Sequence, residues 1–134
     1  MFYNLIKIEV IILARIVHFE LNVKNVEETI KFYKNVFGWK IEKWDGPIDY
    51  WLIMTGDETK PGIDGGLGYE EEDFPKLVNT IDVDNVDETI KKIENNGGEI
   101  IRPKHAVPGV GWLAYFKDTE GIITGIMQED TEAK

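Results

Sequence analysis

Polar side chains occupy every second position of one short stretch near the start of the sequence. His18, Glu20 and Asn22 alternate with apolar residues in IVHFELNV, residues 16–23. A period of two is that of a β-strand, so the imidazole, the carboxylate and the amide are expected on one face. Such an imidazole can contact a ligand or act as a general base, since its pKa lies near neutrality. The alternative is a histidine that only hydrogen-bonds a neighbour such as Glu20 or a backbone carbonyl.

The sequence that follows this strand occurs twice. NVKNVEETIK at 22–31 and DVDNVDETIK at 82–91 are identical at seven of ten positions, at an offset of sixty residues. Two copies are too few for a solenoid and indicate two similar modules packed on each other. Asn22 and Asp82 are equivalent in this repeat, so we expect them near a pseudo-two-fold axis. Thr80 and Asp82 are expected to join the polar groups of the first strand on one concave face.

Each copy carries the signals of a β-α-β-β-β module. Asn25 and Asn85 each precede a glutamate by three residues, as in a capping box, and so mark two helix starts. Glycine ends both helical patterns, at Gly38 and at Gly97. His105 falls between two prolines and is expected in an exposed loop. The expected strands are 16–23, 39–44, 49–55, 63–68, 77–83, 99–102, 112–117 and 122–128, and the loop that holds His105 is 104–111.

The chain is expected to form a single domain. Its 134 residues are enough for one shared core, whereas each half alone would be marginal. We divide it into an N-terminal arm or extra strand (1–15), a first module (16–68), a linker (69–76), a second module (77–128) and an acidic tail (129–134).

Composition excludes several classes of protein. The sequence has no cysteine and no serine, which rules out disulfides, cysteine-ligated zinc, and thiol or serine nucleophiles. The formal net charge of −10 opposes binding to nucleic-acid phosphates, which needs clustered lysine and arginine. The apolar run at 1–13 is too short to cross a bilayer and has no signal-cleavage pattern. We therefore expect a cytoplasmic protein that binds neither nucleic acid nor a membrane.

The doubled module and its local motifs resemble the vicinal-oxygen-chelate superfamily, which contains glyoxalase I, extradiol dioxygenases and bleomycin-resistance proteins. The matching stretches are His18, VEETIKFYKNVFGW at 26–39, IENNGG at 93–98 and DTEG at 118–121. The resemblance implies an α+β fold in which two paired βαβββ modules form an open, barrel-like curved sheet with the helices outside. Such folds often dimerise, and the arm and exposed sheet edges add to the expectation of a homodimer.

The resemblance also implies where a divalent metal would be held. Metal-dependent members use His and Glu side chains from the first and last strands of both modules. Carried over, one position falls on His18, but two fall on Val78 and Gly125, which cannot ligate. The remaining position lies within 64–68, where Asp64 is the only carboxylate. Catalytic metal sites need about three protein ligands, so no cofactor is expected, and a divalent metal in a non-standard site is the runner-up.

Strand aromatics complete the set of candidate residues. Alternation directs only one set of side chains on each strand toward the cavity, and the sequence does not say which set. An apolar, aromatic pocket with a few polar groups is typical of small-molecule sites. The candidate pocket residues are His18, Glu20, Asn22, Tyr50, Trp51, Thr80, Asp82, Trp112 and Tyr115.

Three functions remain open after these observations. The first is a metal-independent, glyoxalase/bleomycin-resistance-like protein that binds a small apolar or aromatic molecule. The second is a metal-dependent lyase, isomerase or dioxygenase of the same superfamily with a non-standard metal site. The third is a structural or regulatory dimer with a filled cavity. Whether the protein is an enzyme stays open among them.

Overall fold

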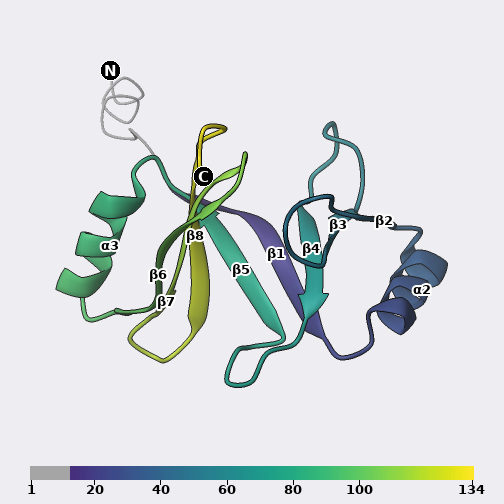
Figure 1. The fold of residues 1–134 in the computed structure, drawn as a ribbon, viewed down its shortest axis with the longest axis horizontal. Helices are drawn as coiled ribbons and strands as arrows, with labels where there is room; N and C mark the ends of the chain where they lie inside the picture. Colours follow the sequence, from purple (N-terminus) through teal and green to yellow (C-terminus); the bar gives the residue numbers. More distant parts are fainter. Residues whose placement is uncertain (1–12) are drawn as a thin grey trace, which may run out of the picture.

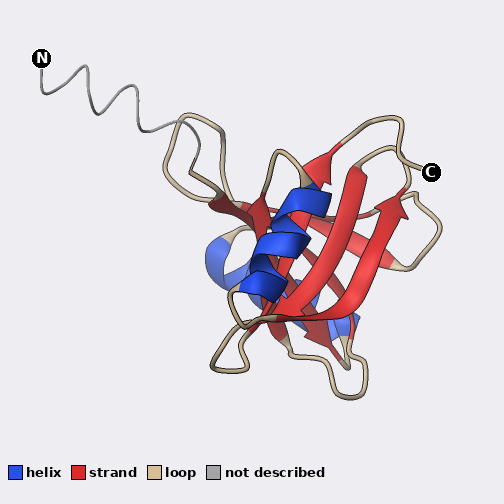
Figure 2. Ribbon diagram, turned by 90° about the vertical axis from the view of Figure 1, so that its left-hand side faces the viewer, coloured by secondary structure: helices blue, strands red, loops and turns tan. Residues whose placement is uncertain are grey.

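The computed structural model describes residues 13–134, and the first part of the N-terminal arm, 1–12, lies outside the described residues. Eight strands form one open, curved, mixed sheet, and one helix packs on the outside of each half (Figures 1 and 2). This is the expected α+β fold class. The elements are β1 (Arg15–Val23), α2 (Val26–Phe37), β2 (Lys40–Lys43), β3 (Tyr50–Met54), β4 (Asp64–Tyr69), β5 (Leu77–Asp82), α3 (Val86–Asn95), β6 (Glu99–Val107), β7 (Gly111–Lys117) and β8 (Ile123–Glu129).

The two modules meet at the centre of the sheet. The strand order is β2-β3-β4-β1-β5-β8-β7-β6, so β1 and β5 form the junction, and they run antiparallel. Phe19 pairs with Asn79, which is its own equivalent in the sixty-residue repeat. The pseudo-two-fold axis therefore passes through this pair. On either side β4 pairs parallel with β1 and β8 pairs parallel with β5, as two related modules require.

The expectation that Asn22 and Asp82 lie near this axis is wrong. The backbone N–H of Asn22 donates to Lys76 O at 2.8 Å at one end of the junction, whereas Asp82 pairs with Arg15 at the other end. The physical reason is the antiparallel pairing, because equivalent residues of two antiparallel strands approach each other only at the middle of the pair.

Each module has its own apolar core between its helix and its share of the sheet. In the first module Val26 of α2 packs with Ile53 and Leu67. In the second, Val86 of α3 packs with Ala114 and Ile126. Both helices begin at the predicted asparagine caps, whose side-chain oxygens each accept a backbone N–H at 3.0 Å. Neither of these helices, the two in the described part of the chain, is long and apolar enough to cross a membrane.

The prediction of a loop at 104–111 is wrong for the first part of this range. β6 continues through Pro103 to Val107 and places His105 opposite Leu113 of β7. A proline is tolerated here because β6 lies at the edge of the sheet, where backbone N–H groups on the outer side have no neighbouring strand to bond. The pairing of β6 with β7 also shifts in register on either side of Arg102. His105 is exposed, as expected, and its Nδ1 lies 3.0 Å from Pro103 O.

Candidate functional site

The polar row of β1 lies on the concave face of the sheet. Phe19 and Leu21 pack into the core beneath α2, so strand alternation directs His18, Glu20 and Asn22 to the opposite face. Asn22 is buried, and the other two side chains are partly buried. The prediction that these three side chains share one face therefore agrees with the structure.

Glu20 is the centre of a hydrogen-bonded network that joins both modules. Its Oε1 accepts a hydrogen bond from the Tyr115 hydroxyl at 3.1 Å, and its Oε2 accepts one from Asn22 Nδ2, also at 3.1 Å. Burial raises the pKa of Glu20, and the hydrogen bonds from Asn22 and Tyr115 only partly oppose this. Burial and the adjacent Glu20 carboxylate raise the pKa of Tyr115, so its hydroxyl stays protonated and remains a donor.

His18 forms a second pair on the same face. Its Nε2 lies 3.0 Å from the Tyr50 hydroxyl of β3. Burial lowers the pKa of His18, although the Asp64 carboxylate acts in the other direction. Burial also raises the pKa of Tyr50. The pair is therefore a neutral imidazole beside a neutral phenol at pH 7, and it carries no charge of its own.

Two glycines allow the tyrosines to lie across the sheet. Gly66 of β4 pairs with Glu20, and Gly125 of β8 pairs with Thr80, which is the repeat equivalent of Glu20. The two glycines are therefore equivalent. A Cβ at Gly66 would overlap the Tyr50 hydroxyl, and one at Gly125 would lie 3.1 Å from Thr80 Oγ1. Both positions thus need glycine or a shift of the neighbouring side chain.

The linker between β4 and β5 covers the second-module half of this face. We name residues 70–76 the strap. The ring of Phe74 lies edge-to-face on Tyr115, with centroids 5.0 Å apart, and Arg102 of β6 lies 3.9 Å from the centre of the Phe74 ring. Arg102 Nη1 also pairs with Glu71 Oε2 at 3.1 Å. The only sequence signal for this arrangement is an aromatic residue within an otherwise acidic linker.

Three of the predicted pocket residues lie apart from this network. Trp51 packs against the core beneath α2, and Trp112 packs against the core beneath α3. The strand phase therefore turns Tyr50 and Tyr115 to the concave face and both tryptophans to the helix side. Asp82 lines a separate hollow of about 480 Å³ with Val17 and Met127. The predicted residues that the structure brings together are His18, Glu20, Asn22, Tyr50, Thr80 and Tyr115.

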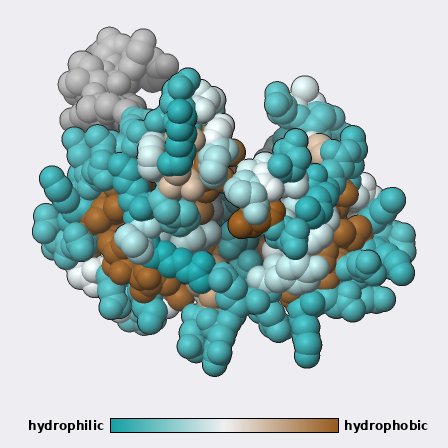
Figure 3. All heavy atoms as spheres, in the orientation of Figure 1, coloured by the Kyte–Doolittle hydropathy of each residue, from teal (hydrophilic) through white to brown (hydrophobic). Residues whose placement is uncertain are grey.

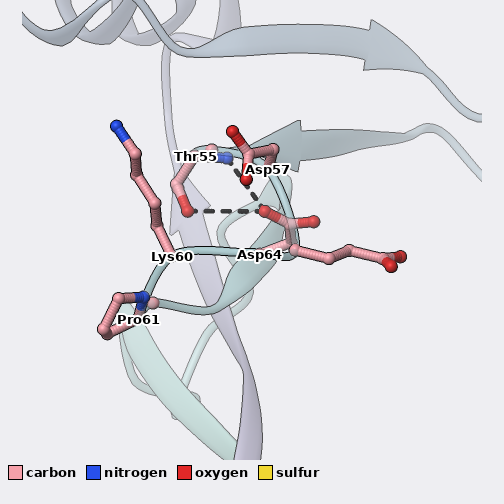
Figure 4. Close-up of a pocket in the computed structure, with 8 residues that line it drawn as sticks. Thr55, Asp57, Lys60, Pro61 and Asp64 are labelled. Atoms are coloured by element: carbon pink, nitrogen blue, oxygen red, sulfur yellow. Dashed lines mark hydrogen bonds between the residues drawn. The ribbon is translucent and has the colours of Figure 1, made fainter.

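Another hollow, of about 390 Å³, lies against the loop between β3 and β4. Figure 4 shows Thr55, Asp57, Lys60, Pro61 and Asp64 around it. Asp64 Oδ1 accepts the backbone N–H of Thr55 at 2.9 Å, so this carboxylate holds the loop in place.

The surface of the molecule is also notched between its two halves. The notch lies at the upper edge of the space-filling view, which has the orientation of Figure 1 (Figure 3).

Comparison with known proteins assigns the fold to a family. A family model described as the Glyoxalase/Bleomycin resistance protein/Dioxygenase superfamily matches residues 15–124. The chain belongs to this superfamily. The predicted resemblance, stated above under its vicinal-oxygen-chelate name, is thereby confirmed.

Individual relatives of the superfamily are similar over most of this chain. A glyoxylase-like domain-containing protein of Didymella fabae is 33% identical over 109 residues, which are 76% of this chain and 84% of that protein. CFP32 of Mycobacterium tuberculosis, named as a glyoxylase, is 28% identical over 104 residues. Those residues are 73% of this chain but only 39% of CFP32, so the chain spans well under half of that relative.

Solved structures of the superfamily share the fold. A variant of methylmalonyl-CoA epimerase from Streptomyces coelicolor, in complex with 2-nitronate-propionyl-CoA, superposes with a TM-score of 0.66. The superposition covers 92% of this chain and 99% of that chain at 16% sequence identity. At this identity the likeness concerns the fold alone.

The residues present do not fit the divalent metal of metal-dependent superfamily members. Gly66 is equivalent to Gly125, so it occupies the last-strand ligand position of the first module. Because neither glycine nor Val78 can ligate, His18 is the only donor at the four family positions. Both oxygens of Glu20, the nearest further carboxylate on β1, already accept hydrogen bonds from Tyr115 and Asn22. Within residues 13–134, no group of three or more His, Cys, Asp or Glu side chains is arranged to hold a metal ion.

Proposed function

We propose that this protein is a metal-independent member of the superfamily that binds a small apolar or aromatic molecule on the concave face of its sheet. The observation that carries the proposal is the exchange at the metal-ligand positions. Gly66, Val78 and Gly125 stand where donors would be needed, and the phenol rings of Tyr50 and Tyr115 lie over or against the two glycines. The space around the ligand positions is thus lined by aromatic surface.

The chemistry of this face suits recognition of a small organic molecule. The phenol rings of Tyr50 and Tyr115 supply apolar faces. Glu20 supplies a carboxylate that accepts hydrogen bonds, and His18 supplies a neutral imidazole. Small-molecule sites typically combine apolar walls with a few convergent polar groups of this kind. Buried polar groups discriminate strongly between ligands, because a ligand that fails to pair with them leaves them unsatisfied.

Elemental analysis of the purified protein, with thermal melts in the presence of divalent metals or chelator, tests the metal-independent part. We expect no stoichiometric metal and an unchanged melting temperature. Stoichiometric metal that raises the melting temperature, and that is lost in His18→Ala, would instead support the metal-dependent lyase, isomerase or dioxygenase function.

A melt screen against aromatic small molecules tests the binding part. A ligand present at a hundred times its Kd adds about 2.7 kcal/mol of stability, which corresponds to a rise of roughly 10 °C for a chain of this size. Tyr115→Ala should abolish the rise, whereas Trp112→Phe, on the helix side of the same strand, should retain it. A ligand that raises the melting temperatures of both variants equally would bind elsewhere.

A second candidate function is a structural or regulatory role with a filled concave face. It is favoured by the position of Phe74 on Tyr115 and of Tyr50 over Gly66, since both side chains occupy space that a ligand would use. This candidate predicts no ligand-induced rise in the melting temperature, neither for the wild-type protein nor for a Phe74→Ala variant that clears part of the space.

A further inference from the structure

Arg102 holds two chemically different groups of the strap at once. Its Nη1 lies 3.1 Å from Glu71 Oε2, and its Cζ lies 3.9 Å from the centre of the Phe74 ring. A planar guanidinium accepts a carboxylate at its edge and an aromatic ring on its face, and these two modes do not compete. The strap therefore presents a carboxylate and an aromatic ring to the same arginine.

The strap reaches directly into the polar network of the concave face. Phe74 lies on the ring of Tyr115, whose hydroxyl donates to Glu20. Asn22, the other donor to Glu20, also donates from Nδ2 to Pro75 O at 3.0 Å. The side chains that would contact a ligand on this half of the face are thus already in contact with the chain's own residues.

We propose that the strap acts as an internal ligand of this site, and that the molecule which replaces it is an aromatic carboxylate. This inference rests on the proposed small-molecule function and names the class of ligand. The replacing ring would lie between Arg102 and Tyr115 in the place of Phe74, and its carboxylate would pair with Arg102 in the place of Glu71.

Geometry limits the size of this ligand. The Glu71 oxygen and the Phe74 ring centre both lie close to one guanidinium, so they are at most about 8 Å apart, given C–N bonds of about 1.3 Å. A benzene ring joined to a carboxylate by one to three carbons spans such a distance. Phenylacetate and 3-phenylpropionate both fall within this limit.

Arg102 favours an anionic ligand over a neutral one in this exchange, because a neutral ligand that displaced Glu71 would leave the guanidinium without a carboxylate partner. The chain has a formal net charge of −10, and Glu20 lies near Arg102, so an added carboxylate would be repelled if Arg102 kept its partner. Replacing Glu71 keeps the number of carboxylates on Arg102 the same. The Glu71 and Arg102 side chains are 56% and 37% exposed, and ion pairs this exposed contribute little to stability, so this part of the strap can be displaced.

Calorimetric titration with 3-phenylpropionate tests the inference, with neutral 3-phenylpropionamide and aliphatic hexanoate as comparison ligands. If the strap fills the site about nine-tenths of the time, its removal raises the apparent affinity about tenfold. We therefore expect Glu71→Gln/Phe74→Ala to bind 3-phenylpropionate about tenfold more tightly than the wild type. Glu72→Gln is the matched control, because it removes the same charge from the next residue, and it should bind as the wild type does.

Arg102→Met gives the complementary result. It keeps a long apolar side chain over the ring but loses the guanidinium, so 3-phenylpropionate should bind about tenfold more weakly, whereas 3-phenylpropionamide should not be weakened. Thermal melts of every variant verify folding. If the double variant does not fold, Glu71→Gln alone carries the test, with a smaller increase in affinity expected in the same direction.

The outcomes separate this inference from the function on which it rests. If aromatic ligands bind the wild type and the strap variants with equal affinity, or if the amide binds as well as the carboxylate, the inference is overturned and the binding function stands. If neither aromatic ligand binds the wild type or the double variant, the inference fails, and the melt screen against other aromatic molecules decides the proposed function.

Discussion

The two modules carry different side chains at equivalent positions of the same framework. The buried valines Val26 and Val86 begin both helices, and asparagine caps precede both. On the concave face, however, His18 and Glu20 of β1 correspond to valine and threonine of β5. The residues that build the helix and its core are thus retained between modules, whereas those that give the concave face its polarity differ. The site belongs mainly to the first module's strand and to the second module's tyrosine.

The largest effect should fall on the shared framework. Leu67 and Ile126 are fully buried, and they occupy equivalent positions in β4 and β8. Leu67→Ala and Ile126→Ala should each reduce the free energy of unfolding by about 3 kcal/mol, because each leaves a cavity in its module's core. Urea denaturation measures both. If one substitution cost far less than the other, the two cores would not be equivalent in energy.

The next largest effect should separate the equivalent glycines. Gly66→Ala places a Cβ against the Tyr50 hydroxyl and should destabilise the protein by about 2 kcal/mol, whereas Gly125→Ala meets its neighbours at 3.1 Å or more and should cost less than about 1 kcal/mol. Thermal melts measure the difference. In a Tyr50→Ala background the cost of Gly66→Ala should largely disappear, and a cost that persists would show that the tyrosine is not its cause.

A smaller, pH-dependent effect should distinguish Glu20 from its equivalent Thr80. Because burial holds the folded pKa of Glu20 above its ordinary value of 4.5, its contribution to stability is complete below that pH and is lost as pH rises through the raised pKa. Glu20→Gln should therefore gain stability relative to the wild type as pH increases from 4 to 8. The free energy of unfolding of Thr80→Val should differ from that of the wild type by the same amount at every pH. Chemical denaturation at a series of pH values measures both, and a flat Glu20→Gln difference would contradict the burial argument.

The smallest effect on monomer stability concerns the outer helices. Phe32 and Val36 of α2 are 56% and 57% exposed, whereas the equivalent residues of the second module are polar: Lys92 of α3 and Asn96, which caps that helix. We propose a homodimer that uses this face of α2. Phe32→Lys/Val36→Asn should change the free energy of unfolding of the monomer by less than about 0.5 kcal/mol and convert a dimer to a monomer in light scattering. The matched control is Lys92→Gln on α3, and dimers that persist in the double variant would exclude this face.

Local patterns predicted most of the fold because they depend on neighbours in sequence. The caps at Asn25 and Asn85 and the alternation of β1 are properties of a few adjacent residues. The continuation of β6 through Pro103 could not be predicted, because a proline is tolerated only at certain positions in a sheet and one segment does not reveal its own position. The position of Asp82 could not be predicted for a similar reason, since the repeat shows which residues are equivalent but not the direction in which the two strands meet.

The site was less predictable because its contacts join distant parts of the chain. Whether Tyr50 or Trp51 faces the cavity depends on the phase of β3 against β4, which no local pattern fixes. The contact of Phe74 with Tyr115 and Arg102 brings together three segments that carry no shared motif. The polar row of β1 could be predicted, whereas the residues that cover it became visible only in the folded chain.

The strap also has a covalent role, since it is the stretch of chain that joins the two modules. The modules are held to each other as well by the antiparallel pairing of β1 with β5, from Arg15 to Leu21 on one strand and from Leu77 to Asp82 on the other. A single protease cut within the strap should therefore leave two fragments associated through backbone hydrogen bonds while releasing the cover over Tyr115. Limited proteolysis would then yield a nicked but still folded protein, and an aromatic carboxylate that displaces the strap should accelerate the cut.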